Sequence, residues 1–142
     1  MKLPIAPKGV SSTSSYWDNI QFSAAIRDTD RKFIEELGFT LIDKNANGWL
    51  HITKSIIEHR DYIGHCLVYC SSGVGSLEIG RLRATLVPKS FTIFNDYDRH
   101  LFKPHTSHVN LMVVTVKQGT FRRKRDKFYP EVSYVRPVEI LI

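Results

Sequence analysis

The chain has 142 residues, which fits a single domain large enough to bury a substantial core. Hydrophobic residues make up 42% and aromatic residues 11%, and this composition excludes wholesale disorder. The formal net charge is +6, and residues 117–127 alone hold six basic residues against one acidic residue. No apolar run is long enough to span a bilayer and the N-terminus lacks a signal-peptide pattern, so we expect a cytoplasmic protein with no membrane partner.

The first predicted elements are an arm and a helix. Residues 1–15 contain two prolines and four serines without periodicity, which indicates a flexible N-terminal arm ahead of one domain over residues 16–142. Residues 28–38 predict the helix, because Asp28 is a good N-cap and Gly38 is a natural stop. This helix is short, so it must gain stability by packing its apolar stripe on a sheet. The stripe consists of Phe33, Ile34 and Leu37.

Short runs rich in β-branched and aromatic residues follow, separated by Gly, Pro and Asn turns. Residues 39–43 and 49–53 predict a β-hairpin around the loop 44–48. Residues 109–117 are apolar on both alternating faces, which predicts a central strand buried on each side. The pattern therefore predicts a mainly β domain, a jelly-roll or β-sandwich with one short N-terminal helix. The other predicted strands are residues 63–70, 76–79, 83–87, 91–95, 99–102, 131–134 and 138–142.

The two cysteines, Cys66 and Cys70, fall on one predicted strand. Four strand residues separate their Cα atoms by about 13 Å, whereas a disulfide requires about 7 Å or less. We therefore expect no bridge within the chain and interpret both thiols as small apolar core groups.

The order of parts over residues 47–117 resembles a known arrangement. A strand that begins with Arg60 is followed by a turn with two glycines, a short strand, a proline-led turn, an apolar strand and the tripeptide 100–102. This order is similar to the cupin-like sensor domain of AraC-type transcription regulators. The resemblance implies a ligand-sensing and dimerisation module, which would act as a homodimer and reach DNA only through a domain not contained in this chain.

The same resemblance implies a pocket for a small sugar-like molecule inside the barrel. The matching positions are Arg60 at the strand start and His100 and Phe102 on the later strand, with Trp49 as a possible aromatic wall. A buried arginine usually has an anionic or polyhydroxyl partner. The alternative interpretation is that Arg60 pairs at the surface with an acidic neighbour in the sequence.

Metal-binding cupins place two histidines two residues apart on an early strand, followed by a glutamate, with a last histidine on a later strand. This sequence offers His65 alone on the early strand and His100 on the later one. Because three or four ligands are needed to hold zinc or iron, we predict no metal site and no cofactor. The spacing of the other histidines predicts no convergence; these are His51, His59, His105 and His108.

The sequence also predicts that the chain is not an enzyme. A covalent nucleophile needs a base and an orienting group, but His65 and Cys66 are strand neighbours and would point to opposite faces. The serines of the turn 71–75 lack the strand–turn–helix setting of a nucleophile elbow. A cupin isomerase or dioxygenase would require the histidine pair that the early strand lacks.

Arg27 and Arg31 stand four residues apart at the start of the predicted helix, where two guanidinium groups could each grip a phosphate. This RxxxR spacing resembles the motif by which PilZ domains hold cyclic di-GMP. The SxxG part of the second PilZ motif matches residues 72–75. Cys70 stands where that second motif has Asp or Asn. We therefore predict a small anionic ligand, with cyclic di-GMP favoured. The alternative is that both arginines pair with nearby acidic residues on a solvated helix face.

The basic loop is the last predicted feature. It contains Arg122, Arg123, Lys124 and Arg125, flanked by aromatic residues. Clustered cations with aromatic neighbours are typical of surfaces that grip a nucleic-acid backbone. A basic nucleic-acid-binding β-domain is therefore the rival to a sensor domain, and a solvated surface loop is the plainer interpretation.

Overall fold

The computed structural model describes residues 2–16, 19–42, 46–61, 64–117 and 132–134, and within these ranges it is mainly β with one helix. The predicted fold class is confirmed. The elements are β1 (Ser14–Tyr16), β2 (Asn19–Gln21), β3 (Ala24–Ala25), α1 (Asp28–Glu36), β4 (Gly48–Ile52), β5 (His65–Ser72), β6 (Gly75–Ile79), β7 (Leu82–Leu86), β8 (Phe91–Asn95), β9 (Leu101–Pro104), β10 (Val109–Val116) and β11 (Val132–Tyr134).

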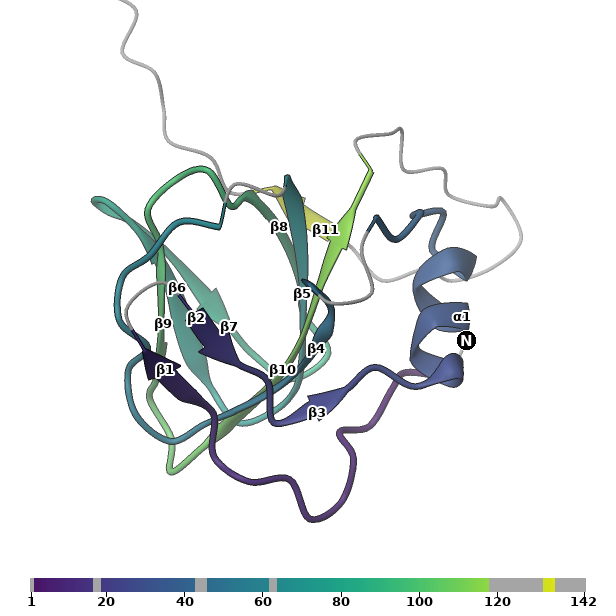
Figure 1. Ribbon diagram of the computed structural model, residues 1–142, viewed down its shortest axis with the longest axis horizontal. Helices are drawn as coiled ribbons and strands as arrows, with labels where there is room; N and C mark the ends of the chain where they lie inside the picture. The colour runs from purple at the N-terminus through teal and green to yellow at the C-terminus, as the bar shows by residue number, and fades with distance from the viewer. Residues whose placement is uncertain (1, 17–18, 43–45, 62–63, 118–131, 135–142) are drawn as a thin grey trace, which may run out of the picture.

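Two sheets face each other around one hydrophobic core (Figure 1). The larger sheet has the strand order β11-β8-β5-β10-β4-β3, and the smaller has the order β7-β6-β9. Their facing side chains share one cluster, to which the larger sheet gives Val68, Phe94 and Leu111 and the smaller gives Leu77 and Phe102. This is the predicted β-sandwich, held by apolar surface that neither sheet could bury alone.

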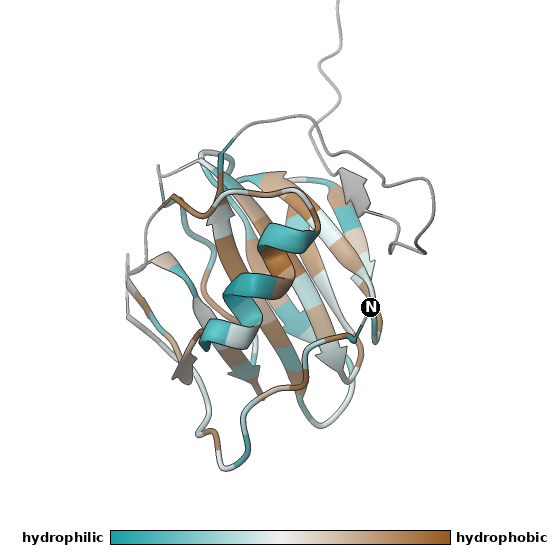
Figure 2. Ribbon diagram, turned by 90° about the vertical axis from the view of Figure 1, so that its right-hand side faces the viewer, coloured by the Kyte–Doolittle hydropathy of each residue, from teal (hydrophilic) through white to brown (hydrophobic). Residues whose placement is uncertain are grey.

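A second core lies on the outer face of the larger sheet, under α1. Leu67 and Tyr69 of β5 point to this face, whereas Cys66, Val68 and Cys70 point into the sandwich. Figure 2 shows the helix lying across this sheet with its hydrophilic side outward. The predicted stripe of the helix is buried here, and β10 is a central strand with both faces covered, as predicted. Both cysteines are buried and free, which confirms the absence of a bridge between them.

The predicted hairpin between residues 39–43 and 49–53 is wrong. β4 pairs with β3 and β10, and Leu41 makes an isolated antiparallel bridge with Val116 at the far end of β10. Both segments therefore follow one edge of β10, one after the other. The long apolar strand β10 gives each of them a buried partner, which a local hairpin with a polar loop could not supply.

The helix begins at Asp28, the first residue of the predicted range, and ends at Glu36. Arg27, not Asp28, is the N-cap residue, because the Asp30 carboxylate accepts a 2.9 Å hydrogen bond from the Arg27 backbone N–H. At the other end Gly38 adopts a left-handed φ of 98° and donates from its backbone N–H to the Glu35 carbonyl. No helix among the described residues is long and apolar enough to cross a membrane.

The segment before α1 lies against both cores. The Tyr69 hydroxyl donates a 2.9 Å hydrogen bond to the Pro4 carbonyl, and Thr13 pairs by its backbone N–H with the His51 carbonyl at 2.8 Å. β1 and β2 then form a separate two-stranded sheet. Ile20 of β2 and the following Phe22 pack on the sandwich core, so this segment closes one side of the space between the sheets.

Candidate metal and ligand site

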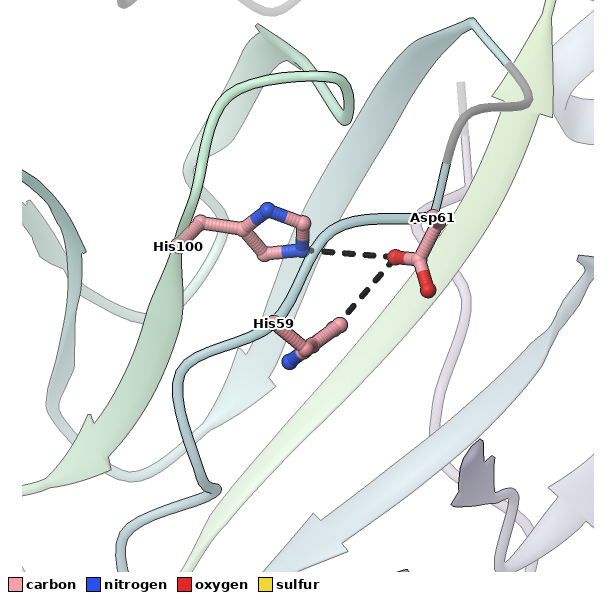
Figure 3. Close-up of side chains that lie close together, drawn as sticks. All are labelled: His59, Asp61 and His100. Carbon is pink, nitrogen blue, oxygen red and sulfur yellow. Dashed lines mark ion pairs between the residues drawn. The ribbon is translucent and has the colours of Figure 1, made fainter. Parts of the chain in front are cut away.

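Three polar side chains converge at one end of the sandwich: His59, Asp61 and His100 (Figure 3). His59 and Asp61 come from the connection between β4 and β5, and His100 immediately precedes β9. An isolated antiparallel bridge joins the two histidines, each backbone N–H donating to the carbonyl of the other at 3.0 Å. The bridge sets the two rings side by side, with centroids 4.3 Å apart.

The Asp61 carboxylate lies between the two imidazoles. Its Oδ2 is 3.3 Å from Nε2 of His59 and 3.4 Å from Nε2 of His100. One ligand atom of each residue lies within 4.8 Å of the other two. The arrangement thus directs two nitrogen atoms and one carboxylate oxygen toward a common point.

The other ring nitrogen of each histidine fixes its tautomer. Nδ1 of His59 lies 2.8 Å from the Ile57 carbonyl, and Nδ1 of His100 lies 2.7 Å from the Asp98 carbonyl. A carbonyl oxygen can only accept a hydrogen bond, so both Nδ1 atoms carry a proton. In a neutral ring Nε2 is then unprotonated, and its lone pair faces the common point. Nε2 of His59 is buried and makes no hydrogen bond, although Asp61 lies at ion-pair distance.

The electrostatics of the cluster favour a positive charge between these groups. Burial opposes the charged form of Asp61, but the imidazoles of His100 and His59 outweigh it and hold the pKa of this carboxyl well below its usual range. Burial alone would lower the pKa of His59, yet the Asp61 carboxylate and the Ile57 carbonyl raise it. A proton on Nε2 of His59 supplies this positive charge, and a metal cation would supply it as well.

The cluster forms one wall of a cavity of about 140 Å³ between the two sheets. Most of the remaining lining is apolar. The fully buried part of this apolar lining consists of sandwich-core residues. Its half-buried part consists of Ile20 of β2, Phe22 and Ala46. The apolar lining residues are Ile20, Phe22, Ala46, Leu50, Phe94, Phe102 and Val113.

The cavity lining contains two further ionisable side chains, those of Asp96 and Cys66. Asp96 is 3% exposed, and its Oδ1 accepts a 2.8 Å hydrogen bond from the Gly64 backbone N–H. Burial, together with the negative charges of Asp96 and Asp61, raises the pKa of the Cys66 thiol well above its ordinary value. Cys66 is therefore a protonated thiol rather than a reactive thiolate.

The structure brings together only two of the four residues predicted for a pocket inside the barrel. His100 and Phe102 line the cavity. Trp49 does not, because strand alternation turns it to the opposite face of the larger sheet, where its Nε1 donates a 2.8 Å hydrogen bond to Asp30. Arg60 is exposed and does not line the cavity.

Arg27 and Arg31 are not brought together around a shared cavity. A second cavity, of about 390 Å³ between the N-terminal arm and α1, is lined by Arg27 but not by Arg31. The Arg27 guanidinium is held by the Asp30 carboxylate, by the Ile5 carbonyl and by the face of Trp49, whose ring centroid is 5.7 Å away. The contact of Arg27 with Asp30 matches the alternative interpretation, in which the arginine pairs with a nearby acidic residue.

The predicted nucleic-acid patch, Arg122, Arg123, Lys124 and Arg125, lies outside the described residues. The strand predicted over residues 138–142 lies outside them as well. Both stay predictions.

Sequence reasoning missed two members of the cluster, His59 and Asp61. The metal pattern of cupins has two histidines two residues apart, and His65 is the histidine on the predicted early strand, but His65 is not part of the cluster. His59 and Asp61 are two residues apart, and a carboxylate is as good a metal ligand as an imidazole. A search for His-x-Asp beside His-x-His would have found the pair.

Comparison with known proteins adds little to this site. No protein-family model matches the sequence, and no curated protein matches it. A similar solved structure is that of a cupin-2 domain containing protein from Shewanella frigidimarina NCIMB 400, with 8% sequence identity and a TM-score of 0.45. The match covers 56% of this chain and 79% of that chain.

Proposed function

We propose that this chain is a small-molecule-binding β-sandwich domain that holds its ligand in the cavity between the sheets, beside a divalent transition-metal ion bound by His59, Asp61 and His100. The observation that carries the proposal is the buried Nε2 of His59, which faces a carboxylate and makes no hydrogen bond. A buried polar atom that makes no hydrogen bond is uncommon in folded proteins. A metal ion would satisfy it.

The donor set fits such an ion. Two imidazole nitrogens and one carboxylate suit zinc, iron, cobalt and manganese, and three protein ligands leave coordination positions open. The Nδ1–H bonds to the carbonyls of Ile57 and Asp98 are the supporting contacts that metal-ligating histidines usually have. When bound, the ion would supply Lewis acidity and a point of attachment for a ligand oxygen.

The residues of the chain have separate tasks in this proposal. The two carbonyl contacts keep the Nε2 lone pairs directed at the common point. Asp61 contributes the negative charge that offsets the charge of the cation. The apolar wall around Phe94 and Phe102 excludes water and strengthens the electrostatic interactions at the cluster. Without a metal ion, a proton on Nε2 of His59 takes the place of the cation.

The test measures metal stoichiometry and affinity. Protein stripped with a chelator is titrated with Zn²⁺ and Co²⁺ by calorimetry, and bound metal is measured by elemental analysis after desalting. We expect about one ion per chain in the wild type and at least a tenfold weaker affinity in Asp61→Asn and in His100→Gln, because each removes one ligand. His108→Gln is the matched control, since His108 lies outside the cluster and stacks on His51 near the surface.

Two results would overturn the proposal. One is a wild-type protein that retains no ion at micromolar metal. The other is loss of the bound ion in His108→Gln with the ion retained in Asp61→Asn, which would place the metal at the His51–His108 pair. Circular dichroism of each variant separates loss of a ligand from loss of the fold.

We further propose that the domain binds its ligand without converting it, as the sequence predicted. A metal ion with open positions can also activate a ligand, so conversion is the alternative. Recovery of a bound ligand unchanged after aerobic incubation with the Fe²⁺-loaded and Zn²⁺-loaded protein supports binding. A new product that appears only with loaded wild-type protein, and not with Asp61→Asn, would support an enzyme.

As a second proposal we retain the sensor function of an AraC-type regulator, because His100 and Phe102 lie in the cavity at the positions that the resemblance assigns to ligand binding. Cyclic di-GMP has less support, since Arg27 is already held by Asp30 and does not share a cavity with Arg31. Calorimetry with cyclic di-GMP decides: binding that is lost in Arg27→Ala and in Arg31→Ala would favour this ligand, and no binding to wild type would remove it.

A further inference from the structure

We infer that Phe22, seated on Gly48, sets the size of the molecule that the cavity admits, and that the ligand is a small chelating molecule with an apolar body. This inference rests on the proposed metal site. It concerns the part of the cavity beyond His59, Asp61 and His100, and the residue that limits the size of that part.

The volume of the cavity bounds the ligand. A cavity of about 140 Å³ is close to the volume of roughly 150 Å³ that holds a benzene molecule in an apolar protein interior. A hexose is larger and would require hydroxyl partners along its whole length. The walls formed by Leu50, Phe94, Phe102 and Val113 offer no such partners. The sugar-like ligand that the resemblance implies is therefore a poor fit.

The polar groups of the lining are placed unevenly. His59, Asp61 and His100 converge on one side. Asp96, Thr115 and Cys66 add further polar atoms to the lining, and the remaining lining residues are aliphatic or aromatic. A ligand that matches this distribution has oxygen donors at one end, to complete the coordination of the ion, and a compact hydrocarbon part at the other. Short-chain hydroxamic, 2-oxo or 2-hydroxy acids have this form.

The mouth of the cavity lies beside β2. Ile20, Phe22 and Ala46 are half-buried and Asp61 is 34% exposed, whereas Leu50, Phe94 and Phe102 are almost fully buried. A ligand therefore enters past these less buried residues. Phe22 carries the largest side chain among them.

Gly48 fixes the position of the Phe22 ring. A Cβ atom built on Gly48 would lie 2.5 Å from Cγ of Phe22 and 2.9 Å from its Cβ, so the ring occupies the space that any other residue at position 48 would fill. Ala25 pairs with Gly48 and Ser23 donates to the Trp49 carbonyl, so the backbone on either side of the contact is tied to β4. The ring is therefore held against the strand and forms a fixed wall.

The experiment uses the Co²⁺-loaded protein and three hydroxamic acids of increasing chain length, namely acetohydroxamic, butyrohydroxamic and octanohydroxamic acid. Binding to the ion is followed by the shift of the cobalt visible absorption bands, which does not depend on any catalytic activity. In the wild type we expect affinity to rise roughly fourfold per methylene from acetohydroxamic to butyrohydroxamic acid, because each methylene is buried. Octanohydroxamic acid should bind at least tenfold more weakly than butyrohydroxamic acid, because its chain exceeds the cavity.

The decisive variant is Phe22→Ala. We expect this substitution to raise the affinity for octanohydroxamic acid at least tenfold. The affinity for acetohydroxamic acid should stay within about threefold of the wild-type value. Gly48→Ala, which displaces the ring by a different route, should alter the same chain-length preference. Val87→Ala is the control, because Val87 is exposed and lies outside the lining; it should leave the preference unchanged.

The outcomes separate this inference from the metal proposal. If no cobalt spectrum appears, the metal site has failed, and with it the basis of the inference. If cobalt binds at His59, Asp61 and His100 but affinity does not depend on chain length in the wild type, the size limit is wrong while the metal site stands. If Phe22→Ala changes all three affinities equally, Phe22 does not set the size.

Discussion

His59 and His100 are tied to each other by two reciprocal backbone hydrogen bonds of 3.0 Å, and both rings direct Nε2 at the same carboxylate oxygen. Residues separated by some forty positions are thereby fixed in register, so the cluster exists only when the two connections are folded together. Its formation is a property of the native state, and a cation bound there must stabilise that state.

The first prediction follows from this linkage. Zn²⁺ at one hundred times its Kd should raise the free energy of unfolding by about 2.7 kcal/mol, because the unfolded chain does not hold the three ligands together. For a domain of this size the melting temperature should rise by roughly 8 °C. Differential scanning calorimetry of wild type, Asp61→Asn and His108→Gln measures it. A shift of equal size in Asp61→Asn would contradict binding at the cluster.

The second prediction concerns the contact between Phe22 and Gly48. Gly48→Ala should lower the free energy of unfolding by about 1–3 kcal/mol, the usual cost of forcing atoms into a filled space. In a Phe22→Ala background the same substitution should cost much less, because the obstructing ring is gone. Urea denaturation of the four proteins gives the coupling energy. Additive effects would show that the two residues do not compete for one space.

The third prediction separates a close approach from backbone strain. Gly73 has φ of +78°, and a Cβ added to it would lie 2.1 Å from the His108 carbonyl oxygen. Gly80 has φ of +58° but nothing within 4 Å of the corresponding position. Gly73→Ala should therefore destabilise the domain clearly more than Gly80→Ala, which bears the cost of the left-handed backbone alone, about 1–2 kcal/mol. Equal losses in urea denaturation would contradict the close approach.

The sequence predicted well those features that depend on local pattern. Strand β8 was predicted with its observed bounds, residues 91–95, because a run of aromatic and β-branched residues stands between two clear turns. The burial of β10 on both faces followed from its unbroken apolar run, and the helix stripe from its spacing. In each case one short window of sequence contains the whole signal.

The features that failed depend on distant pairing. Residues 39–43 were matched to their neighbour in sequence, whereas the structure pairs Leu41 with Val116. The cluster of His59, Asp61 and His100 likewise needs the two histidines to meet across an isolated bridge, which no local pattern contains. Trp49 was assigned to the pocket from its residue type, but which face of β4 it occupies depends on the register with β10.

The fourth prediction concerns Asp30, which is 1% exposed and accepts hydrogen bonds from Trp49 Nε1 and from Arg27. Asp30→Ala should lower the free energy of unfolding by about 3 kcal/mol, because it leaves a buried indole N–H without an acceptor and removes the partner of Arg27. Asp30→Asn keeps an acceptor oxygen and should cost less. Chemical denaturation followed by tryptophan fluorescence measures both, and equal losses would show that the acceptor is not what matters.

The last prediction concerns stability at high pH. Burial raises the pKa of the Cys70 thiol from 9.0 to about 11, and burial together with the charge of Cys70 raises the pKa of Tyr69 from 10.0 to about 12. The unfolded chain therefore loses these protons at lower pH than the folded chain does. The stability that they contribute is complete below about pH 9 and is lost as the pH rises toward 12.

Urea denaturation between pH 8 and pH 11 tests this effect. The wild type should lose stability steadily over this range, and Cys70→Ala should lose less, because one of the buried groups with a raised pKa no longer titrates. Cys70→Ala also leaves a small cavity, so the slope with pH and not the absolute stability is the relevant quantity. Tyr69→Phe removes the hydrogen bond to Pro4 and should likewise flatten the upper part of the curve. Parallel pH curves for all three proteins would show that neither buried group controls the loss of stability in base.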